Sequence, residues 1–121
     1  MSKMILTVDD SKSMRMLLRN ALTQRGYEVV EAEDGVAALE WLRDNSPTLV
    51  ITDINMPRMD GFGFIDEVRK HPQHRATPIL VLTTESEPAK KQRARDAGAT
   101  GWIVKPFDPA KLIAAVSRVS P

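Results

Sequence analysis

Acidic side chains stand directly after two apolar runs of this chain. Asp9 and Asp10 follow the run MILTV at residues 4–8, and Asp53 follows TLVIT at residues 48–52. Two carboxylates about 4 Å apart repel each other by about 4 kcal/mol at an effective dielectric constant of about 20. If these residues converge, they must be protonated or hold a cation. The group offers only oxygen ligands, with no His or Cys nearby. Such a set of ligands predicts a hard divalent cation, and Mg²⁺ fits it best.

The ends of two further apolar runs carry Thr83 and Lys105. Mg²⁺ commonly shares phosphate oxygens, and an aspartate can itself attack phosphorus to form an aspartyl phosphate. In that chemistry Lys105 would pair with phosphoryl oxygens, and the Thr83 hydroxyl would donate a hydrogen bond. Each residue alone has a simpler interpretation, as a helix cap, a strand residue or a solvated lysine. Their joint occurrence at one sheet edge favours a nucleophile site, with Asp53 as the acceptor.

Short apolar runs alternate with amphipathic stretches along the whole chain. The apolar runs predict strands at residues 4–8, 27–32, 48–52, 78–83 and 101–104. Helices are predicted up to about residue 25, from Asp34-Gly35 onward, near 62–70, over 87–97 and from Asp108-Pro109 onward. This alternation predicts an α/β protein with a parallel sheet covered by helices on both faces, the less apolar second strand lying at an edge. Ligands of such sheets lie beyond the carboxyl ends of the strands, where the acidic residues and Lys105 are expected.

Length and composition bound the class of protein. The chain has 121 residues, which suits one domain without a separate output domain, and we expect residues 1–121 to form it. Lys and Arg total 17 against 16 Asp and Glu, so the net charge of +1 gives no reason to expect a nucleic-acid or membrane partner. The absence of Cys excludes disulfides and thiol catalysis. No signal peptide or membrane span fits the N-terminal sequence, so we expect a cytoplasmic protein.

Four fragments of the sequence occur in a characteristic order and spacing. They are VDDS at residues 8–11, TDINMPRMDG at 52–61, LTT at 82–84 and DAGATGWIVKPF at 96–107. This ordered set resembles response regulator receiver domains, and within them the stand-alone chemotaxis (CheY-like) type. The resemblance implies a flavodoxin-like sheet with the strand order 2-1-3-4-5.

The resemblance also implies roles for the residues at the strand ends. Asp53 would be phosphorylated, and Mg²⁺ would be bound by Asp10, Asp53 and the backbone carbonyl of Asn55, with Asp9 acting through water. Thr83 and Lys105 would contact the phosphoryl group. By the same resemblance, the peptide bond between Lys105 and Pro106 would be cis.

The function implied by this resemblance is that of a phosphorylation-activated switch in a two-component, chemotaxis-type phosphorelay. A histidine kinase would supply the phosphoryl group, and no cofactor besides Mg²⁺ is implied. Such a module would assist its own phosphorylation and dephosphorylation without being an enzyme that acts on a metabolite. Asn55 and Glu85 occupy positions that match chemotaxis members with short-lived phosphoryl groups, whereas the bulk of Thr84 could crowd the entry to Asp53.

Phosphorylation adds a charge of about −1.5 to −2 and three strong acceptor oxygens, which can move nearby groups. We expect Thr83 to be drawn toward the phosphoryl group and Trp102 to turn inward, the alternative being that Trp102 simply packs on its strand. The change would reach the face formed by the fourth helix, fifth strand and fifth helix. That face would bind a downstream partner such as a flagellar motor switch protein, and the chain is expected to be a monomer.

Two other functions compete with this interpretation. A phosphate-sink receiver would drain a kinase without having an output target, and nothing in the sequence separates the two kinds of receiver. A phosphatase of the haloacid-dehalogenase kind would use Asp53 as its nucleophile and a second carboxylate two residues later as general acid. Asn55 occupies that position and cannot transfer the proton, which argues against the phosphatase.

Overall fold

The structure, a computed structural model, describes residues 3–120, so residues 1, 2 and 121 of the predicted domain lie outside the described residues. The strands are β1 (Met4–Val8), β2 (Glu28–Ala32), β3 (Leu49–Thr52), β4 (Ile79–Thr83) and β5 (Gly101–Val104). The helices are α1 (Lys12–Thr23), α2 (Gly35–Leu42), α3 (Gly61–Lys70), α4 (Pro88–Ala97) and α5 (Pro109–Val119), with a 3₁₀ turn, η1 (Pro72–His74), after α3. Every predicted strand and helix is therefore present within the described residues.

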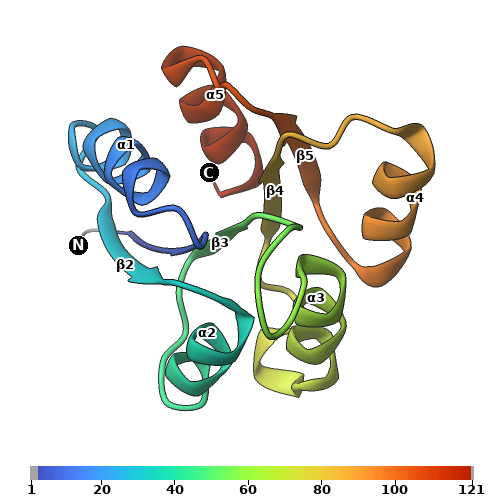
Figure 1. Cartoon of the computed structure of the whole chain (residues 1–121). Coiled ribbons are helices and arrows are strands. Elements are labelled where there is room, and N and C mark those ends of the chain that lie inside the picture. Colours follow the sequence, from blue (N-terminus) through green and yellow to red (C-terminus); the bar gives the residue numbers. More distant parts are fainter. Residues whose placement is uncertain (1–2, 121) are drawn as a thin grey trace.

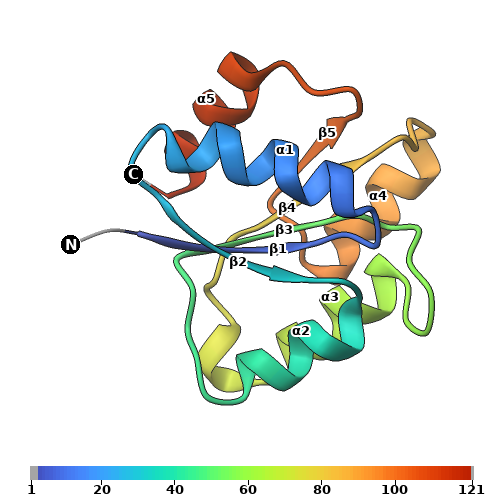
Figure 2. The same ribbon diagram turned by 60° about the vertical axis from the view of Figure 1, so that its left-hand side comes forward.

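Within residues 3–120, the strands form one sheet in the order β2-β1-β3-β4-β5, and every neighbouring pair is parallel. The predicted fold and strand order are confirmed, including the edge position of β2. Helices α1 and α5 cover one face, and α2, α3 and α4 cover the other (Figures 1 and 2). All strands consequently end at the same side of the molecule.

Each face of the sheet has its own hydrophobic core. Under α1 and α5, the core contains Leu18, Leu22, Leu112 and Val116, all buried. Under α2, α3 and α4, the buried side chains come mainly from the sheet and from α3, and α4 contributes only Ala94. Burial of side chains on both faces explains why β1, β3 and β4 are apolar at almost every position.

Helix α4 is attached to the rest of the fold by few apolar contacts. It begins after Glu87 with Pro88 in its first turn and ends at Gly98, whose φ of 118° is left-handed. Besides Ala94, its contact with α3 includes the guanidinium of Arg93, which lies 4.1 Å from the centre of the Phe62 ring. A helix that buries so little apolar area gains little stability from packing.

Two local features differ from the predictions. Helix α1 ends at Thr23 and not near residue 25, because Arg25 and Gly26 donate to carbonyls only three residues earlier and Gly26 adopts a φ of 88°. The turn η1 was not predicted. None of the helices within residues 3–120 combines the length and apolar character that crossing a bilayer requires.

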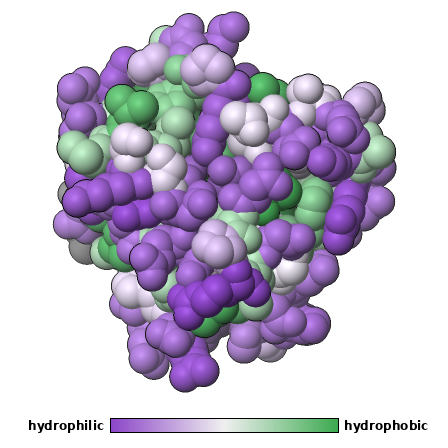
Figure 3. Space-filling view, viewed as in Figure 1, coloured by the Kyte–Doolittle hydropathy of each residue, from purple (hydrophilic) through white to green (hydrophobic). Residues whose placement is uncertain are grey.

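Exposed apolar side chains occur on α1, where Met16 and Leu17 are 55% and 54% exposed. Leu17 also lines a recess between α1 and the start of α5, together with Met14, Ala21 and Phe107. This apolar patch is visible between α1 and α5 in the upper left of Figure 3. Most of the remaining surface in that view is hydrophilic.

Candidate functional site

The ends of β1 and β3 place the predicted acidic residues side by side. Val8 pairs with Thr52 across the two strands, and the Asp53 N–H donates to the Val8 carbonyl at 2.9 Å. Carboxylate oxygens of Asp9, Asp10 and Asp53 consequently lie within 4.8 Å of one another. Asp9 and Asp53 are buried and Asp10 is exposed, so the group, the acid pocket, opens to solvent on the Asp10 side.

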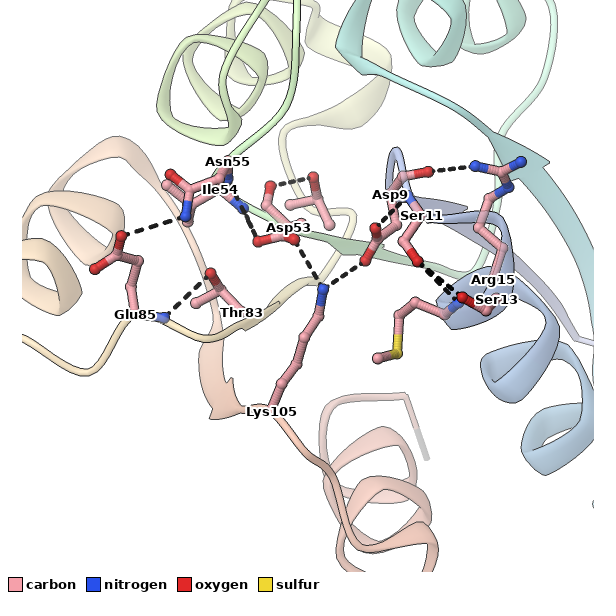
Figure 4. A network of polar contacts seen from close by, with 12 residues as sticks. Asp9, Ser11, Ser13, Arg15, Asp53, Ile54, Asn55, Thr83, Glu85 and Lys105 are labelled. Carbon is pink, nitrogen blue, oxygen red and sulfur yellow. Dashed lines mark hydrogen bonds and ion pairs between the residues drawn. The ribbon is translucent and has the colours of Figure 1, made fainter.

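Lys105 directly follows β5, the edge strand beyond β4, and its side chain reaches the acid pocket. Its backbone N–H donates to the Thr83 carbonyl at 2.8 Å, and the Lys105–Pro106 peptide bond is cis, as expected. The Nζ atom lies 2.8 Å from Asp9 Oδ2 and 2.8 Å from Asp53 Oδ2 (Figure 4). The lysine side chain is only 10% exposed, so water screens these two ion pairs weakly.

The charges in the acid pocket depend on this lysine. Burial is the largest single influence on Lys105 and acts to lower its pKa, but the hydrogen bonds to Asp53 and Asp9 outweigh burial, so its pKa is raised. Burial raises the pKa of Asp9, while Lys105 and the Ser11 N–H act in the opposite direction. Lys105 is therefore protonated at neutral pH and supplies positive charge between two carboxylates that would otherwise repel each other.

The acid pocket also has the donor set of a site for a hard cation. Its carboxylates come from three residues, within reach of one another, and no nitrogen or sulfur ligand is among them. Asp53 is held in place because its Oδ1 accepts from the Ile54 N–H at 2.6 Å and from the Asn55 N–H at 3.4 Å. These residues fit Mg²⁺, which prefers oxygen ligands and few protein side chains.

Thr83 is the last residue of β4, and Glu85 lies on the loop after that strand, at the rim of the acid pocket. Thr83 is fully buried, and its hydroxyl accepts from the Glu85 N–H at 3.4 Å. The Glu85 carboxylate accepts from Asn55 Nδ2 at 3.2 Å and pairs with Lys90 at 2.9 Å (Figure 4 shows the first of these). The sequence did not predict these contacts of Glu85. Thr84 is exposed.

Trp102 lies on β5, half-buried against the core beneath α4. Its indole N–H donates to the backbone carbonyl of Glu85 at 3.0 Å. Packing and this hydrogen bond together join β5 to the loop that begins directly after Thr83. The inward movement predicted for Trp102 upon phosphorylation stays a prediction.

Three further ion pairs near the acid pocket were missed by the sequence interpretation. Arg58 has a left-handed φ of 66° and pairs at 2.7 Å with the buried carboxylate of Asp34, which also caps α2. Burial acts to raise the pKa of Asp34, but the hydrogen bond from the Ala37 N–H and the interaction with Arg58 together outweigh burial, so its pKa is lowered. Glu31, on β2, forms ion pairs with both Arg15 and Arg19, at 3.0 and 2.6 Å.

Gly61 begins α3 directly against the acid pocket. A Cβ at this position would overlap the backbone carbonyl of Asp53 and lie 2.7 Å from Ile54 Cα. Backbone atoms cannot rotate away, so we expect Gly61→Ala to lower the free energy of unfolding by about 2 kcal/mol in urea denaturation. The matched control is Gly63→Ala, two residues later in the same helix, where a Cβ would meet its nearest neighbours at 3.5 Å. Gly63→Ala should be as stable as the wild type or more stable. Equal free energies of unfolding for Gly61→Ala and Gly63→Ala would contradict the close packing at Gly61.

Comparison with known proteins gives consistent matches over nearly the whole chain. A family model described as the response regulator receiver domain matches residues 5–117. Chemotaxis protein CheY1 of Helicobacter pylori is 46% identical over 110 residues, covering 89% of each chain. The structure of the chemotaxis response regulator CheY4 of Vibrio cholerae superposes with a TM-score of 0.94 at 45% identity, covering 98% of this chain and 99% of that one.

A third match bears on the acid pocket. The receiver domain of a sensor histidine kinase from Pseudomonas aeruginosa superposes with a TM-score of 0.90 at 25% identity, covering 98% of this chain and 97% of that one. That structure is described as holding a magnesium ion coordinated in its active site cleft.

Proposed function

Because the chain belongs to the response regulator receiver domain family, we propose that it is a phosphorylation-activated switch whose phosphoacceptor is Asp53. Receiver domains of the CheY-like type are signalling modules of two-component systems that work with histidine kinases, and they are not classical enzymes. The observation that carries the proposal is that carboxylate oxygens of Asp9, Asp10 and Asp53 lie within 4.8 Å of one another. Lys105 forms ion pairs with two of these residues, Asp9 and Asp53.

The proposed reaction is transfer of a phosphoryl group from a phosphohistidine of the kinase to Asp53. A carboxylate oxygen of Asp53 attacks phosphorus, the new O–P bond forms, and the N–P bond to the donor imidazole breaks. The imidazole keeps the electron pair of that bond and takes up a proton. Lys105 Nζ and the Thr83 hydroxyl would donate hydrogen bonds to the phosphoryl oxygens as negative charge gathers there.

Mg²⁺ would be held by Asp10, Asp53 and the backbone carbonyl of Asn55, with Asp9 acting through water. When bound, the ion would neutralise part of the charge that the incoming phosphoryl group adds to the carboxylates. The magnesium ion of the Pseudomonas aeruginosa receiver domain supports this assignment. In the same environment, water would later hydrolyse the aspartyl phosphate and reset the switch, so that the chain assists both its phosphorylation and its dephosphorylation.

The output would pass from Thr83 to the face formed by α4, β5 and α5. A phosphoryl group on Asp53 would attract the Thr83 hydroxyl, which now accepts from the Glu85 N–H, and Glu85 is bonded to Trp102. Movement of the loop between β4 and α4, which carries Glu85, would change how Trp102 packs and which surface α4 presents. This face would bind a downstream partner such as a flagellar motor switch protein, and the switch would act as a monomer. The chemotaxis relatives support an output in chemotaxis.

The proposal is tested by intact mass after incubation with a small phosphodonor such as acetyl phosphate, with Mg²⁺ or with a chelator. We expect the wild type to gain one phosphoryl group when Mg²⁺ is present and to show at least about 100-fold slower labelling in chelator, since metal ions supply several kcal/mol in such reactions. Ca²⁺ at the same ionic strength controls for general screening of charge. Absence of labelling with Mg²⁺ would contradict the proposed function.

A further inference from the structure

Glu85 joins the acid pocket to the face formed by α4, β5 and α5, through both its side chain and its backbone. Its Oε1 accepts from Asn55 Nδ2 at 3.2 Å, beside Asp53, and its Oε2 lies 2.9 Å from Lys90 Nζ on α4. Its backbone N–H donates to the Thr83 hydroxyl, and its carbonyl accepts from the Trp102 indole. One carboxylate is therefore shared by the rim of the pocket and the first turns of α4.

Lys90 is the positive charge that faces this carboxylate. It lies in α4, its side chain is 36% exposed, and Glu85 is 23% exposed. A second and longer contact joins Lys90 to Glu87 at 4.0 Å. The adjacent Lys91 is exposed, and within residues 3–120 it forms no ion pair, so the two lysines differ in contacts while carrying the same charge.

We propose that Lys90 is a positioning residue for phosphoryl transfer to Asp53: it holds the Glu85 carboxylate against Asn55 and offsets its negative charge at the rim of the pocket. The proposal rests on the proposed function and adds a residue of α4 to it. A phosphodonor carries negative charge, so a mobile, uncompensated carboxylate beside Asn55 repels it. Because the ion pair between Glu85 and Lys90 joins the acid pocket to α4, a shift of α4 would move the Glu85 carboxylate at the pocket. A change in the pocket would in turn affect the position of α4.

The test compares Lys90→Gln with Lys91→Gln, which removes the same charge one residue later. With acetyl phosphate and Mg²⁺, we expect Lys90→Gln to be phosphorylated about threefold more slowly than wild type, the size expected for a partly exposed ion pair. Lys91→Gln should match the wild type, and Lys90→Arg, which keeps the charge, should recover most of the rate.

A double-mutant cycle separates action through Glu85 from a loss of helix stability. In Glu85→Gln, the ion pair is absent while an amide oxygen can still accept from Asn55, so adding Lys90→Gln should change the rate no further. If Lys90→Gln slows phosphorylation equally in both backgrounds, Lys90 does not act through Glu85 and the proposal is overturned.

A second readout does not depend on phosphorylation. The side-chain amide signals of Asn55 in a ¹⁵N-labelled sample, assigned by their loss in Asn55→Asp, should shift in Lys90→Gln and keep their position in Lys91→Gln. Unchanged signals in both variants would overturn the proposal. A wild type that takes up no phosphoryl group would overturn the proposed function and the role of Lys90 in it, whereas a labelled wild type with equal rates in both lysine variants would overturn the role of Lys90 alone.

Discussion

Asp53→Asn is expected to leave the protein folded and to abolish its phosphorylation. The amide oxygen of Asn can still accept from the Ile54 N–H, which now donates to Asp53 Oδ1 at 2.6 Å, so the loop after β3 keeps its anchor. The amide carries no negative charge and is a poor nucleophile toward phosphorus, and the variant offers one carboxylate fewer to Mg²⁺. Intact mass after incubation with acetyl phosphate and Mg²⁺ should show no added phosphoryl group under conditions that label the wild type fully.

The matched control for this variant is Asp60→Asn. Asp60 lies in the same segment, but its carboxylate caps α3 by accepting from the Gly63 N–H at 2.8 Å. Asn is an equally good capping residue, so Asp60→Asn should be as stable as the wild type and be labelled at the same rate. Full labelling of Asp53→Asn would show that another residue accepts the phosphoryl group.

The strands could be predicted from the sequence because their apolar runs are short and bounded by polar residues. Strands β1 and β5 have the predicted bounds, and the others differ by one residue at their N-terminal ends. The acid pocket could be predicted for the same reason, since a parallel sheet brings the residues after β1 and β3 to one edge. The predicted end of α1 near residue 25 lies past the observed end at Thr23, because Arg25 and Gly26 donate to carbonyls three residues earlier instead of four.

Contacts between loops could not be predicted from residue types. Asn55 and Glu85 are 30 residues apart, and Arg58 and Asp34 are 24 residues apart, so their pairing depends on how the loops are placed by the finished fold. Arg58 also lacks a sequence signal, because its left-handed φ of 66° is usually a property of Gly or Asn. The sequence thus indicates the chemistry of the acid pocket, whereas its connection to α4 became visible only in the structure.

Lys105→Gln is expected to have two large effects, one on stability and one on phosphorylation. The substitution leaves Asp9 and Asp53, both buried, facing each other without the Nζ atom that lies 2.8 Å from each. Removing one partner from a buried ion pair costs on the order of 3 kcal/mol, so the free energy of unfolding in chelator should fall by about that amount. Removal of a donor to the phosphoryl oxygens should slow labelling by acetyl phosphate about 100-fold.

The response to Mg²⁺ tests whether Lys105→Gln lowers stability because the charges of Asp9 and Asp53 are left unbalanced or because packing is lost in general. A ligand that binds only the folded state stabilises it by about 2.7 kcal/mol at 100 times its Kd. Without Lys105, the pocket has one positive charge fewer and should bind Mg²⁺ more tightly. The increase in unfolding free energy on adding Mg²⁺ should therefore be larger in Lys105→Gln than in the wild type.

Lys111→Gln provides the control for Lys105→Gln, because it removes the same charge from an exposed position of α5. It should match the wild type in stability, in its response to Mg²⁺ and in its rate of labelling. If Lys105→Gln loses stability but gains no more from Mg²⁺ than Lys111→Gln does, the lysine acts through packing and does not balance the carboxylates. An unchanged rate of labelling in Lys105→Gln would remove Lys105 from the proposed reaction, because the phosphoryl oxygens would then be stabilised without it.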